Sequence, residues 1–392
     1  MIVQNKKDIS FLCFGGEDWW YHNRGHIDMQ LMRCFSKMGT TLYINSLIMQ
    51  KPNLKKNTGG GKSFSHKLIR KSKSIFRGLR NGGAGFWVYS PISFPTHHIE
   101  WLRSFNRMIL QKQMKLVLHK LRMSNPIVWV ACPPACPVAL EMEKSKLIYQ
   151  RTDRYEEFPN IDTEVIKQCD LELKANAGLT VFVSEQLYEQ EKSQCKEAVF
   201  LDHGVDYDAF AMAHNDQNIP SDISNMNKPV VGFFGNIDVH IFDVALVNKV
   251  VDLLPEMNFV FIGNSSIDTK ELLTKKNVRM LGQKPYEQIP HYGKFFDVAI
   301  MPWQQNRWIE ACNPIKLKEY LALGKPIVST PFAELQKYDH LVYQARTPEE
   351  FAKSIEKALQ EDNPERISAR RKKVEPYTWE KKAELILNKV FE

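Results

Sequence analysis

The residues with the clearest chemical meaning stand in one short run, N-P-I-K-L-K-E, that begins at Asn313. Asn313 can cap a helix, and Pro314 can take the first helical position, where its missing N–H costs no hydrogen bond. Lys316, directly after Ile315, brings a cation into the first turn. Glu319 follows three residues later on roughly the same face of the helix. The run therefore predicts a helix start that carries a cation and, about one turn further on, a carboxylate.

A helix start suits a phosphate group, because it offers unpaired N–H groups and the positive end of the helix dipole. Lys316 would add to this charge, and Glu319 could accept hydrogen bonds from the two hydroxyls of a ribose. Gly324 is expected to end the helix, and residues 327–329 to follow as a buried strand. This arrangement suits a nucleotide-sugar. The alternative is an ordinary capped helix with a Lys–Glu pair on its surface.

Three strand-like segments in the same half of the chain end at a glycine, namely at Gly235, Gly263 and Gly282. Parallel strands of an α/β domain end at the edge where ligands bind, and glycine lets the backbone come close to a nucleotide. These glycines, with Asn236 after the first of them, are therefore predicted to contact the same ligand as the helix start.

Strand-like and helix-like segments alternate along the chain, which is typical of doubly wound parallel sheets. The predicted strands are 9–14, 41–45, 86–89, 127–131, 146–150, 179–184, 198–201, 229–235, 259–263, 278–281, 298–301 and 327–329. The predicted helices include 24–37, 101–122, 243–254, 348–359 and 376–391. Residues 50–85 are polar, basic and rich in Gly and Ser, so this stretch is expected to be mobile in part. The helix 101–122 is expected to be amphipathic, with an apolar side made of Phe105, Ile109, Met114, Val117, Leu118 and Leu121.

We expect an α/β protein of two Rossmann-like doubly wound domains that face a cleft. The N-terminal domain is predicted to span residues 1–214, and a polar stretch with two prolines, 215–229, to act as the linker. The C-terminal domain is predicted to span residues 230–375 and to bind the nucleotide. A last helix within 376–392 is expected to pack back on the N-terminal domain.

The positive charge of the chain is concentrated in one block. Residues 51–122 hold 16 Lys and Arg and one acid, Glu100, so this block carries +15 and the rest of the chain −7. Such a block suits anionic lipid headgroups or an anionic acceptor. The alternative is a solvated basic loop and helix. Nucleic acid is not expected as a partner.

The composition predicts neither a metal site nor a secreted protein. The close cysteine pair Cys132 and Cys136 lacks the second pair of ligands that a zinc site needs. No cofactor is expected, because the helix start and Lys316 can neutralise a leaving diphosphate. The first residues lack a signal-peptide pattern, and no run approaches the roughly 18 apolar residues of a membrane span. We expect a cytoplasmic protein, peripheral on the inner face of a membrane.

Three runs in the second half resemble GT-B-fold bacterial polysaccharide glycosyltransferases. They are N-V-R-M-L-G-Q-K-P-Y-E-Q-I-P-H-Y at 277–292, F-D-V-A-I-M-P-W at 296–303, and the stretch 313–331. Their order is similar to that in teichuronic-acid glycosyltransferases and in the xanthan glucuronosyltransferase type. In the first half, K-L-I-Y-Q-R-T-D-R-Y at 146–155 and D-H-G-V-D at 202–206 also match.

The resemblance implies a hexosyltransferase-like enzyme of polysaccharide biosynthesis. Its donor would be a nucleotide-diphosphate sugar, such as a UDP-sugar, and its acceptor a glycan or a lipid-linked glycan. Gly282, Gln283 and Pro285 would lie near the base, Lys316 at the diphosphate and Glu319 at the ribose.

The resemblance also implies that the N-terminal domain meets the acceptor. Asp153 would be the general base that takes the proton of the attacking hydroxyl. A structural carboxylate paired with Arg151 or Arg154 is the alternative. His203, in the H-G-V-D element, would be a second catalytic residue at the cleft, or else an ordinary strand-end histidine.

Further residues could contact a ligand or merely pack. The loop after the first strand offers Asp18, His22 and Arg24. Trp19, Trp20 and Trp303 could stack on sugar rings or be buried in the core. The G-G-G-K-S run at residues 59–63 lacks the spacing of a phosphate-binding P-loop.

Two departures from the wider family favour an inverting reaction. Many retaining members carry E-x7-E ending at the position of Glu319, but Ala311 stands eight residues before it, and no cation follows Gly235. A nucleotide-sugar epimerase or hydrolase on the same fold is an alternative function. A non-catalytic module that tethers polysaccharide machinery to anionic lipid is another.

Overall fold

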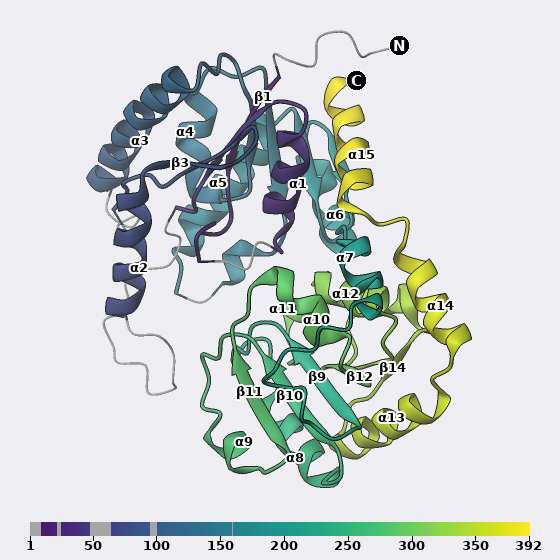
Figure 1. Cartoon of the computed structure of the whole chain (residues 1–392). Helices are drawn as coiled ribbons and strands as arrows, with labels where there is room; N and C mark the ends of the chain where they lie inside the picture. The colour runs from purple at the N-terminus through teal and green to yellow at the C-terminus, as the bar shows by residue number, and fades with distance from the viewer. Residues whose placement is uncertain (1–8, 22–24, 48–63, 95–99, 159, 311) are drawn as a thin grey trace. The chain divides into compact units, whose positions relative to one another are not determined.

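The computed structural model describes residues 9–21, 25–47, 64–94, 100–158, 160–310 and 312–392, and the side chains from residue 69 on in the second helix. The described chain divides into two compact units (Figure 1). The first unit holds the residues up to Asp202 together with 382–392, and the second holds residues 203–381. The domain limits predicted from the sequence stay predictions.

The first unit is built on a sheet of eight strands in the order β3-β4-β2-β1-β5-β6-β7-β8. All neighbours are parallel except the edge strand β3, which runs antiparallel to β4. The strands are β1 Ser10–Phe14, β2 Thr40–Ile44, β3 Leu79–Gly83, β4 Phe86–Tyr89, β5 Ile127–Val130, β6 Lys146–Arg151, β7 Leu179–Phe182 and β8 Ala198–Phe200.

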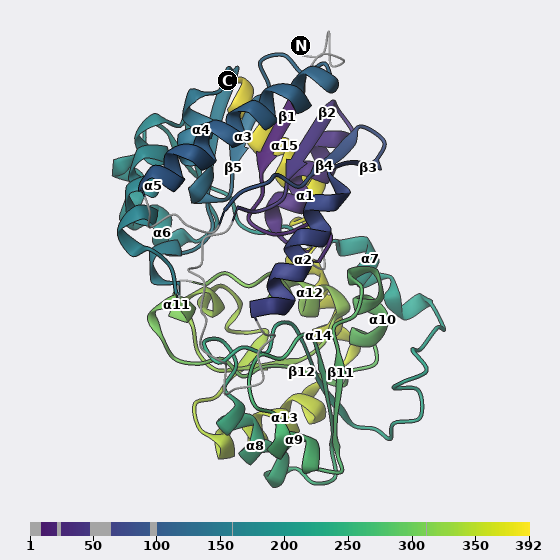
Figure 2. The ribbon, with the colours of Figure 1, turned by 90° about the vertical axis from the view of Figure 1, so that its left-hand side faces the viewer.

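Helices cover both faces of this sheet (Figure 2). Leu12 and Val128 face the helices α3, α4 and α5, while Phe11 and Trp129 contact Phe35 of α1 on the other face. This alternation follows from the two-residue repeat of a strand. The helices are α1 Ile27–Ser36, α2 Phe64–Arg77, α3 Glu100–Lys120, α4 Cys136–Glu141, α5 Thr163–Asn176 and α6 Glu185–Glu191.

The second unit is built on a six-stranded parallel sheet in the order β11-β10-β9-β12-β13-β14. Val230 and Phe234 face one layer of helices, and Val231 and Phe233 face the other. The strands are β9 Val230–Phe234, β10 Asn258–Ile262, β11 Val278–Gly282, β12 Val298–Met301, β13 Ile327–Ser329 and β14 Val342–Gln344.

The helices of the second unit surround this sheet. Helix α12 ends at Gly324, which adopts the left-handed conformation (φ 77°) as the sequence predicts for a helix C-terminus. The helices are α7 Tyr207–Ala211, α8 Val244–Leu253, α9 Lys270–Thr274, α10 Ile289–Gly293, α11 Arg307–Glu310, α12 Ile315–Leu323, α13 Pro348–Glu361 and α14 Pro364–Val374, and the last helix of the chain is α15 Trp379–Phe391.

The C-terminal helix α15 passes from one unit to the other. Its residues from Lys382 on group with the first unit, where Lys146 Nζ donates a hydrogen bond to the Val390 carbonyl at 2.8 Å. The two parallel sheets confirm the predicted α/β class and its doubly wound design.

One prediction about the basic block is wrong, and part of the block holds elements that the sequence did not indicate. Helix α2 and strand β3 form in the part of residues 50–85 that the structure describes. In α3 the buried positions are Asn106, Leu110, Met114 and Val117, whereas Phe105, predicted for the apolar side, is 39% exposed. Asn106 takes the buried position because its amide bonds both the N–H and the carbonyl of Phe94, each at 2.9 Å.

Candidate functional site

Helix α12 begins one residue later than predicted. Its N-cap is Pro314, with extended backbone angles (φ −81°, ψ 125°), and no side chain caps it. The prediction of Asn313 as the cap is therefore wrong. The side-chain oxygen of Asn313 instead accepts a hydrogen bond from Lys318 Nζ at 3.4 Å. Ile315 and Lys316 open the first turn of the helix.

The three strand-end glycines lie side by side, at the ends of the neighbouring strands β9, β10 and β11. All three have positive φ angles, 146° at Gly235, 148° at Gly263 and 67° at Gly282. A Cβ on Gly263 would overlap the Gly235 carbonyl, and the N–H of Gly263 bonds the Gly282 carbonyl at 2.9 Å. Glycine is needed here first of all because these strand ends approach one another.

Lys316 lies against the end of β9. Its Nζ is 4.9 Å from the ring centre of Phe233 and 5.3 Å from that of Trp303, and a Cβ on Gly235 would overlap it. Burial lowers the pKa of Lys316 to about 8, although the charges of neighbouring groups oppose this shift. The amine is therefore a cation at neutral pH, held beside two aromatic rings at a helix start.

Glu319 lies one turn further along α12 and is only 5% exposed. The hydroxyl of Tyr286 donates a hydrogen bond to its Oε1 at 2.9 Å. Burial raises the pKa of Glu319 to about 7, against the effects of Tyr286 and Lys316, and the charge of Asp206 adds to the rise. A further hydrogen-bond donor from a ligand would therefore stabilise the ionised form of this carboxylate.

The remaining predicted donor contacts lie at the surface of the same unit. Asn236, Gln283 and Pro285 are exposed, and Gln283 accepts a hydrogen bond from Asn264 Nδ2 at 2.7 Å. The second unit therefore brings together one set of predicted residues: Gly235, Asn236, Gly263, Gly282, Gln283, Pro285, Asn313, Pro314, Ile315, Lys316 and Glu319.

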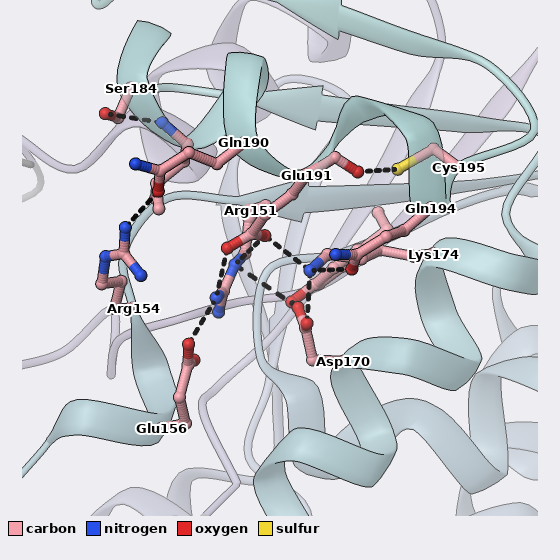
Figure 3. Close-up of polar contacts among 12 residues, drawn as sticks. Arg151, Arg154, Glu156, Asp170, Lys174, Ser184, Gln190, Glu191, Gln194 and Cys195 are labelled. Atoms are coloured by element: carbon pink, nitrogen blue, oxygen red, sulfur yellow. Dashed lines mark hydrogen bonds and ion pairs between the residues drawn. The ribbon is translucent and has the colours of Figure 1, made fainter.

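Asp153 lies in the first unit, directly after β6, and is partly exposed. The neighbouring Arg151 is buried and belongs to a charged cluster (Figure 3). Its Nε and Nη2 donate to Glu191 at 3.1 and 3.2 Å, and Nη2 also donates to Glu156 at 2.9 Å. Asp170 lies 3.4 Å from Nε and completes the set of carboxylates around Arg151.

Arg154, the other arginine considered as a partner of Asp153, bonds Gln190 (Figure 3). Lys174 bonds both Asp170 and Glu191 at 2.5 Å, so the buried cluster holds two cations and three carboxylates. Both predicted partners of Asp153 are therefore engaged by other side chains of the first unit.

His203 lies in the second unit and is 5% exposed. Its ring packs edge-on against Trp379, with 6.3 Å between the ring centres. A Cβ on Gly204 would stand 2.6 Å from the same indole, and the N–H of Val205 bonds the Tyr377 carbonyl at 2.7 Å. The H-G-V-D segment is thus held against the chain that leads into α15.

Of the other candidates, Trp19 is buried against Tyr43 and Phe86, with ring centres 5.5 and 4.6 Å away. Trp20 instead lies 4.9 Å below the guanidinium of Arg77. Trp303 is 2% exposed and stacks on Phe332, besides its contact with the amine of α12.

The remaining candidates of the first unit are Asp18, His22 and Arg24. Asp18 accepts a hydrogen bond from the Trp20 N–H at 3.0 Å and so shapes its own loop. His22 and Arg24 lie outside the described residues, as does the G-G-G-K-S run.

Sequence reasoning missed four polar residues at these strand ends. Tyr286 and Asp206 act on Glu319 in the second unit, and His26 and Asp28 form a short pair in the first. For His26 and Asp28 the sequence offers one signal, a histidine and an aspartate two positions apart near the start of a predicted helix. Their partners come from other strands and cannot be read from spacing.

A cavity of about 470 Å³ lies beside the predicted base contacts of the second unit. It is lined by residues 218–222, Lys284, Gln288, His291 and Tyr292, and by none of the predicted site residues. Within the described residues, no group of three His, Cys, Asp or Glu side chains is placed to hold a metal ion. No helix of that part of the chain has both the length and the apolar character of a bilayer span.

Comparisons with known proteins agree with this architecture. Residues 228–361 match the family described as glycosyl transferases group 1. Over 223 residues the chain is 27% identical to a protein provisionally named a teichuronic acid biosynthesis glycosyltransferase, TuaH, of Bacillus subtilis (strain 168). That match covers 54% of this chain and 56% of the relative, so the chain spans about half the length of the curated relative it matches.

Solved structures match over nearly the whole chain. Sucrose-phosphate synthase from Thermosynechococcus elongatus has a TM-score of 0.67 at 14% identity, covering 98% of both chains. HepE from Anabaena, solved in complex with UDP-glucose, has a TM-score of 0.64 at 14% identity, covering 98% of this chain and 99% of its own. At such identities the likeness establishes the fold.

The fold is therefore that of the GT-B glycosyltransferase structures. Within that class, residues 228–361 match the glycosyl transferases group 1 family, and the similarity to a teichuronic acid glycosyltransferase agrees with the predicted resemblance to bacterial polysaccharide glycosyltransferases.

Proposed function

We propose that this protein transfers a sugar from a nucleotide-diphosphate sugar, a UDP-sugar first of all, to a hydroxyl of a glycan or lipid-linked glycan. The observation that carries the proposal is the start of α12. There Lys316 lies against Gly235, and the Tyr286–Glu319 pair follows one turn later. A cation and free N–H groups suit a diphosphate, and a buried carboxylate suits a ribose.

In this reaction the oxygen of the acceptor hydroxyl attacks the anomeric carbon of the donor. The bond from that carbon to the diphosphate oxygen breaks, and its electron pair leaves with the nucleoside diphosphate. Lys316 and the helix start would stabilise the charge that develops there. Asp153 would take the proton of the hydroxyl as general base. No metal or other cofactor is assigned a part.

The relatives support the choice of donor and product. HepE was solved with UDP-glucose, and the provisional name of the Bacillus relative refers to teichuronic acid biosynthesis. A role in building an acidic polysaccharide, at the cytoplasmic side of a membrane, is therefore the most specific form of the proposal.

A panel of nucleotide-sugars tests the proposed donor. The matching donor should raise the melting temperature of the protein by mass action, and Lys316→Met should abolish this rise. Incubation with donor and candidate acceptors should then release nucleoside diphosphate only when an acceptor is present. Release without any acceptor would support the alternative, a hydrolase or epimerase on the same fold, and would contradict transfer.

The surface of α3 favours attachment to an anionic membrane. Trp101, Phe105, Met108 and Leu116 are 68%, 39%, 43% and 71% exposed. Their spacing of four, three and eight residues aligns them on one side of the helix. Three lysines of the same helix are exposed on this side: Lys112, Lys115 and Lys120. Aromatic side chains flanked by cations are typical of a helix that lies in the interface of an anionic bilayer.

Sedimentation with vesicles tests this surface. We expect binding to vesicles that contain phosphatidylglycerol, weak binding to pure phosphatidylcholine, and a loss of binding with added salt. Replacement of Trp101, Phe105 and Met108 together by Ala should abolish binding, whereas Leu385→Ala, at an equally exposed leucine of α15, should not. A protein that binds these vesicles but no nucleotide would instead support the non-catalytic tether.

A further inference from the structure

A buried carboxylate organises the carboxyl edge of the first sheet. Asp28, in the first turn of α1, has no exposed surface. Its Oδ2 accepts hydrogen bonds from the Gly16 N–H at 2.7 Å and the Tyr43 hydroxyl at 3.0 Å. Its Oδ1 accepts from the Met29 N–H at 2.9 Å and lies 2.5 Å from His26 Nδ1. So many partners fix both the carboxylate and the imidazole that it holds.

His26 stands where this buried group meets the surface, since a quarter of its side chain is exposed. Its Cε1 would lie 3.4 Å from a Cβ on Gly16, the glycine that follows β1. A carboxylate that orients an imidazole at Nδ1 both fixes the ring and favours its protonated form.

Asp153 lies at the same edge of the sheet. Strand β5 separates β1 from β6, and the carbonyl of Ala131, just after β5, would lie 3.5 Å from the same Cβ on Gly16. That carbonyl accepts a hydrogen bond from the Tyr155 hydroxyl at 3.2 Å, and the N–H of Tyr155 bonds the Asp153 carbonyl at 2.9 Å. The loop after β1, the end of β5 and the backbone of Asp153 therefore meet at this edge of the sheet, and the charge of Asp153 acts on His26.

We propose that His26, fixed by Asp28, is a positioning residue for Asp153. Its imidazolium keeps the carboxylate of Asp153 ionised, so that this group is ready to take the proton of the acceptor. The inference rests on the proposed function, in which Asp153 is the base. It adds a buried carboxylate and an imidazolium to the surroundings of the predicted base Asp153.

The charges around the ring agree with this role. Burial alone would lower the pKa of His26, but the charges of Asp28, Glu17 and Asp153 raise it to about 9. These groups come from α1, from the loop after β1 and from the segment after β6. Tyr43 of β2, on the far side of Asp28, stays neutral because burial raises its pKa. His26 is therefore protonated at neutral pH.

Nuclear magnetic resonance tests the pair without any need for activity. We expect the ring signal of His26 in the full chain to titrate near pH 9. Asp28→Asn should lower the midpoint by about 2 pH units, because a direct charged partner is lost. Asp153→Asn should lower it by about 0.5 pH units, less than Asp28→Asn, because the charge of Asp153 has a smaller effect on the ring than that of Asp28. His119→Gln, at an exposed histidine of α3, should leave it unchanged.

A wild-type midpoint near the ordinary value for histidine would overturn the inference. So would a midpoint that does not respond to Asp153→Asn. Neither result would bear on whether the protein transfers sugar, so the two proposals fail separately.

The pH dependence of kcat/KM then tests the catalytic consequence. His26→Gln should move the acid limb of the profile upward by about 0.5 to 1 pH unit, because Asp153 loses a neighbouring cation. His26→Lys, which restores a cation, should return the limb toward its wild-type position. An unshifted limb in His26→Gln, or no recovery in His26→Lys, would refute the positioning role.

Discussion

The hydroxyl of Tyr286 donates a hydrogen bond to Glu319 at 2.9 Å, and so joins the segment after β11 to the first turns of α12. The bond holds one carboxylate oxygen in place and stabilises the ionised form of a group that burial disfavours. If Glu319 binds the ribose, Tyr286 determines both the position and the charge of that contact.

We therefore expect Tyr286→Phe to weaken binding of the donor by about 5- to 10-fold, as expected for the loss of one hydrogen bond to a charged group. Calorimetric titration with UDP measures this. Tyr292→Phe is the matched control, since its hydroxyl bonds Asp222 instead. Equal losses in both variants would argue against a specific role of Tyr286.

Donor affinity should depend on pH with a maximum between about pH 7 and 8. Glu319 must lose its proton above a pKa of about 7 to accept hydrogen bonds, and Lys316 must keep its proton below a pKa of about 8 to attract the diphosphate. Titrations from pH 6 to 9.5 measure the two limbs. Glu319→Gln should remove the acid limb only, and Lys316→Met the alkaline limb. A flat profile in the wild type would contradict this assignment.

Stability of the ligand-free protein should fall as the pH rises from about 4.5 to 7. The folded-state pKa of Glu319 is raised, so its stabilising contribution is complete below the unfolded pKa and is lost as the pH rises through about 7. The loss for this buried group should be about 3 kcal/mol. Urea unfolding at several pH values measures it, and Glu319→Gln should show a smaller decline over the same range.

Removal of Arg151 should destabilise the first unit strongly. Arg151→Met leaves the buried carboxylates of Glu191 and Asp170 with Lys174 as their remaining cation. Uncompensated buried charge of this kind costs about 3 to 5 kcal/mol of the free energy of unfolding. Denaturant unfolding checks this. An unchanged midpoint would show that the cluster contributes little to stability.

Gly263→Ala should cost more stability than Gly282→Ala, although both residues have positive φ angles. A Cβ at Gly263 would overlap the Gly235 carbonyl, whereas no atom lies within 4 Å of a Cβ at Gly282. Backbone strain costs about 1 to 2 kcal/mol at Gly282, and more at Gly263, whose φ of 148° lies outside the left-handed helical region. The excess in Gly263→Ala, measured by thermal unfolding, reports this added strain together with the close approach of β9 and β10. Equal losses would contradict it.

Local chemistry predicted much of the second unit. Three of its strands are short apolar runs that end at a glycine, and α12 ends at Gly324 as predicted. The start of α12 was predicted one residue early, because the side-chain oxygen of Asn313 accepts from the Lys318 side chain instead of capping a backbone N–H of the helix.

Elsewhere the tertiary structure overrides the local pattern. Helix α5 was not predicted, because its buried face includes Asp170 and Lys174, which are satisfied by the cluster around Arg151. In α3 the reverse occurs, since aromatic residues such as Phe105 face outward and a polar Asn106 faces inward. The His26–Asp28 pair was missed because Gly16 and Tyr43, which complete it, are brought in by the sheet.

The central claim is that the start of α12 binds a diphosphate through Lys316. Titration of the full-length protein with UDP at pH 7.5, for the wild type and Lys316→Met, tests it most directly. We predict that the variant keeps its thermal stability but loses about 30-fold or more in affinity, as expected for a partly buried charge–phosphate contact. Equal affinity in both proteins would contradict the account.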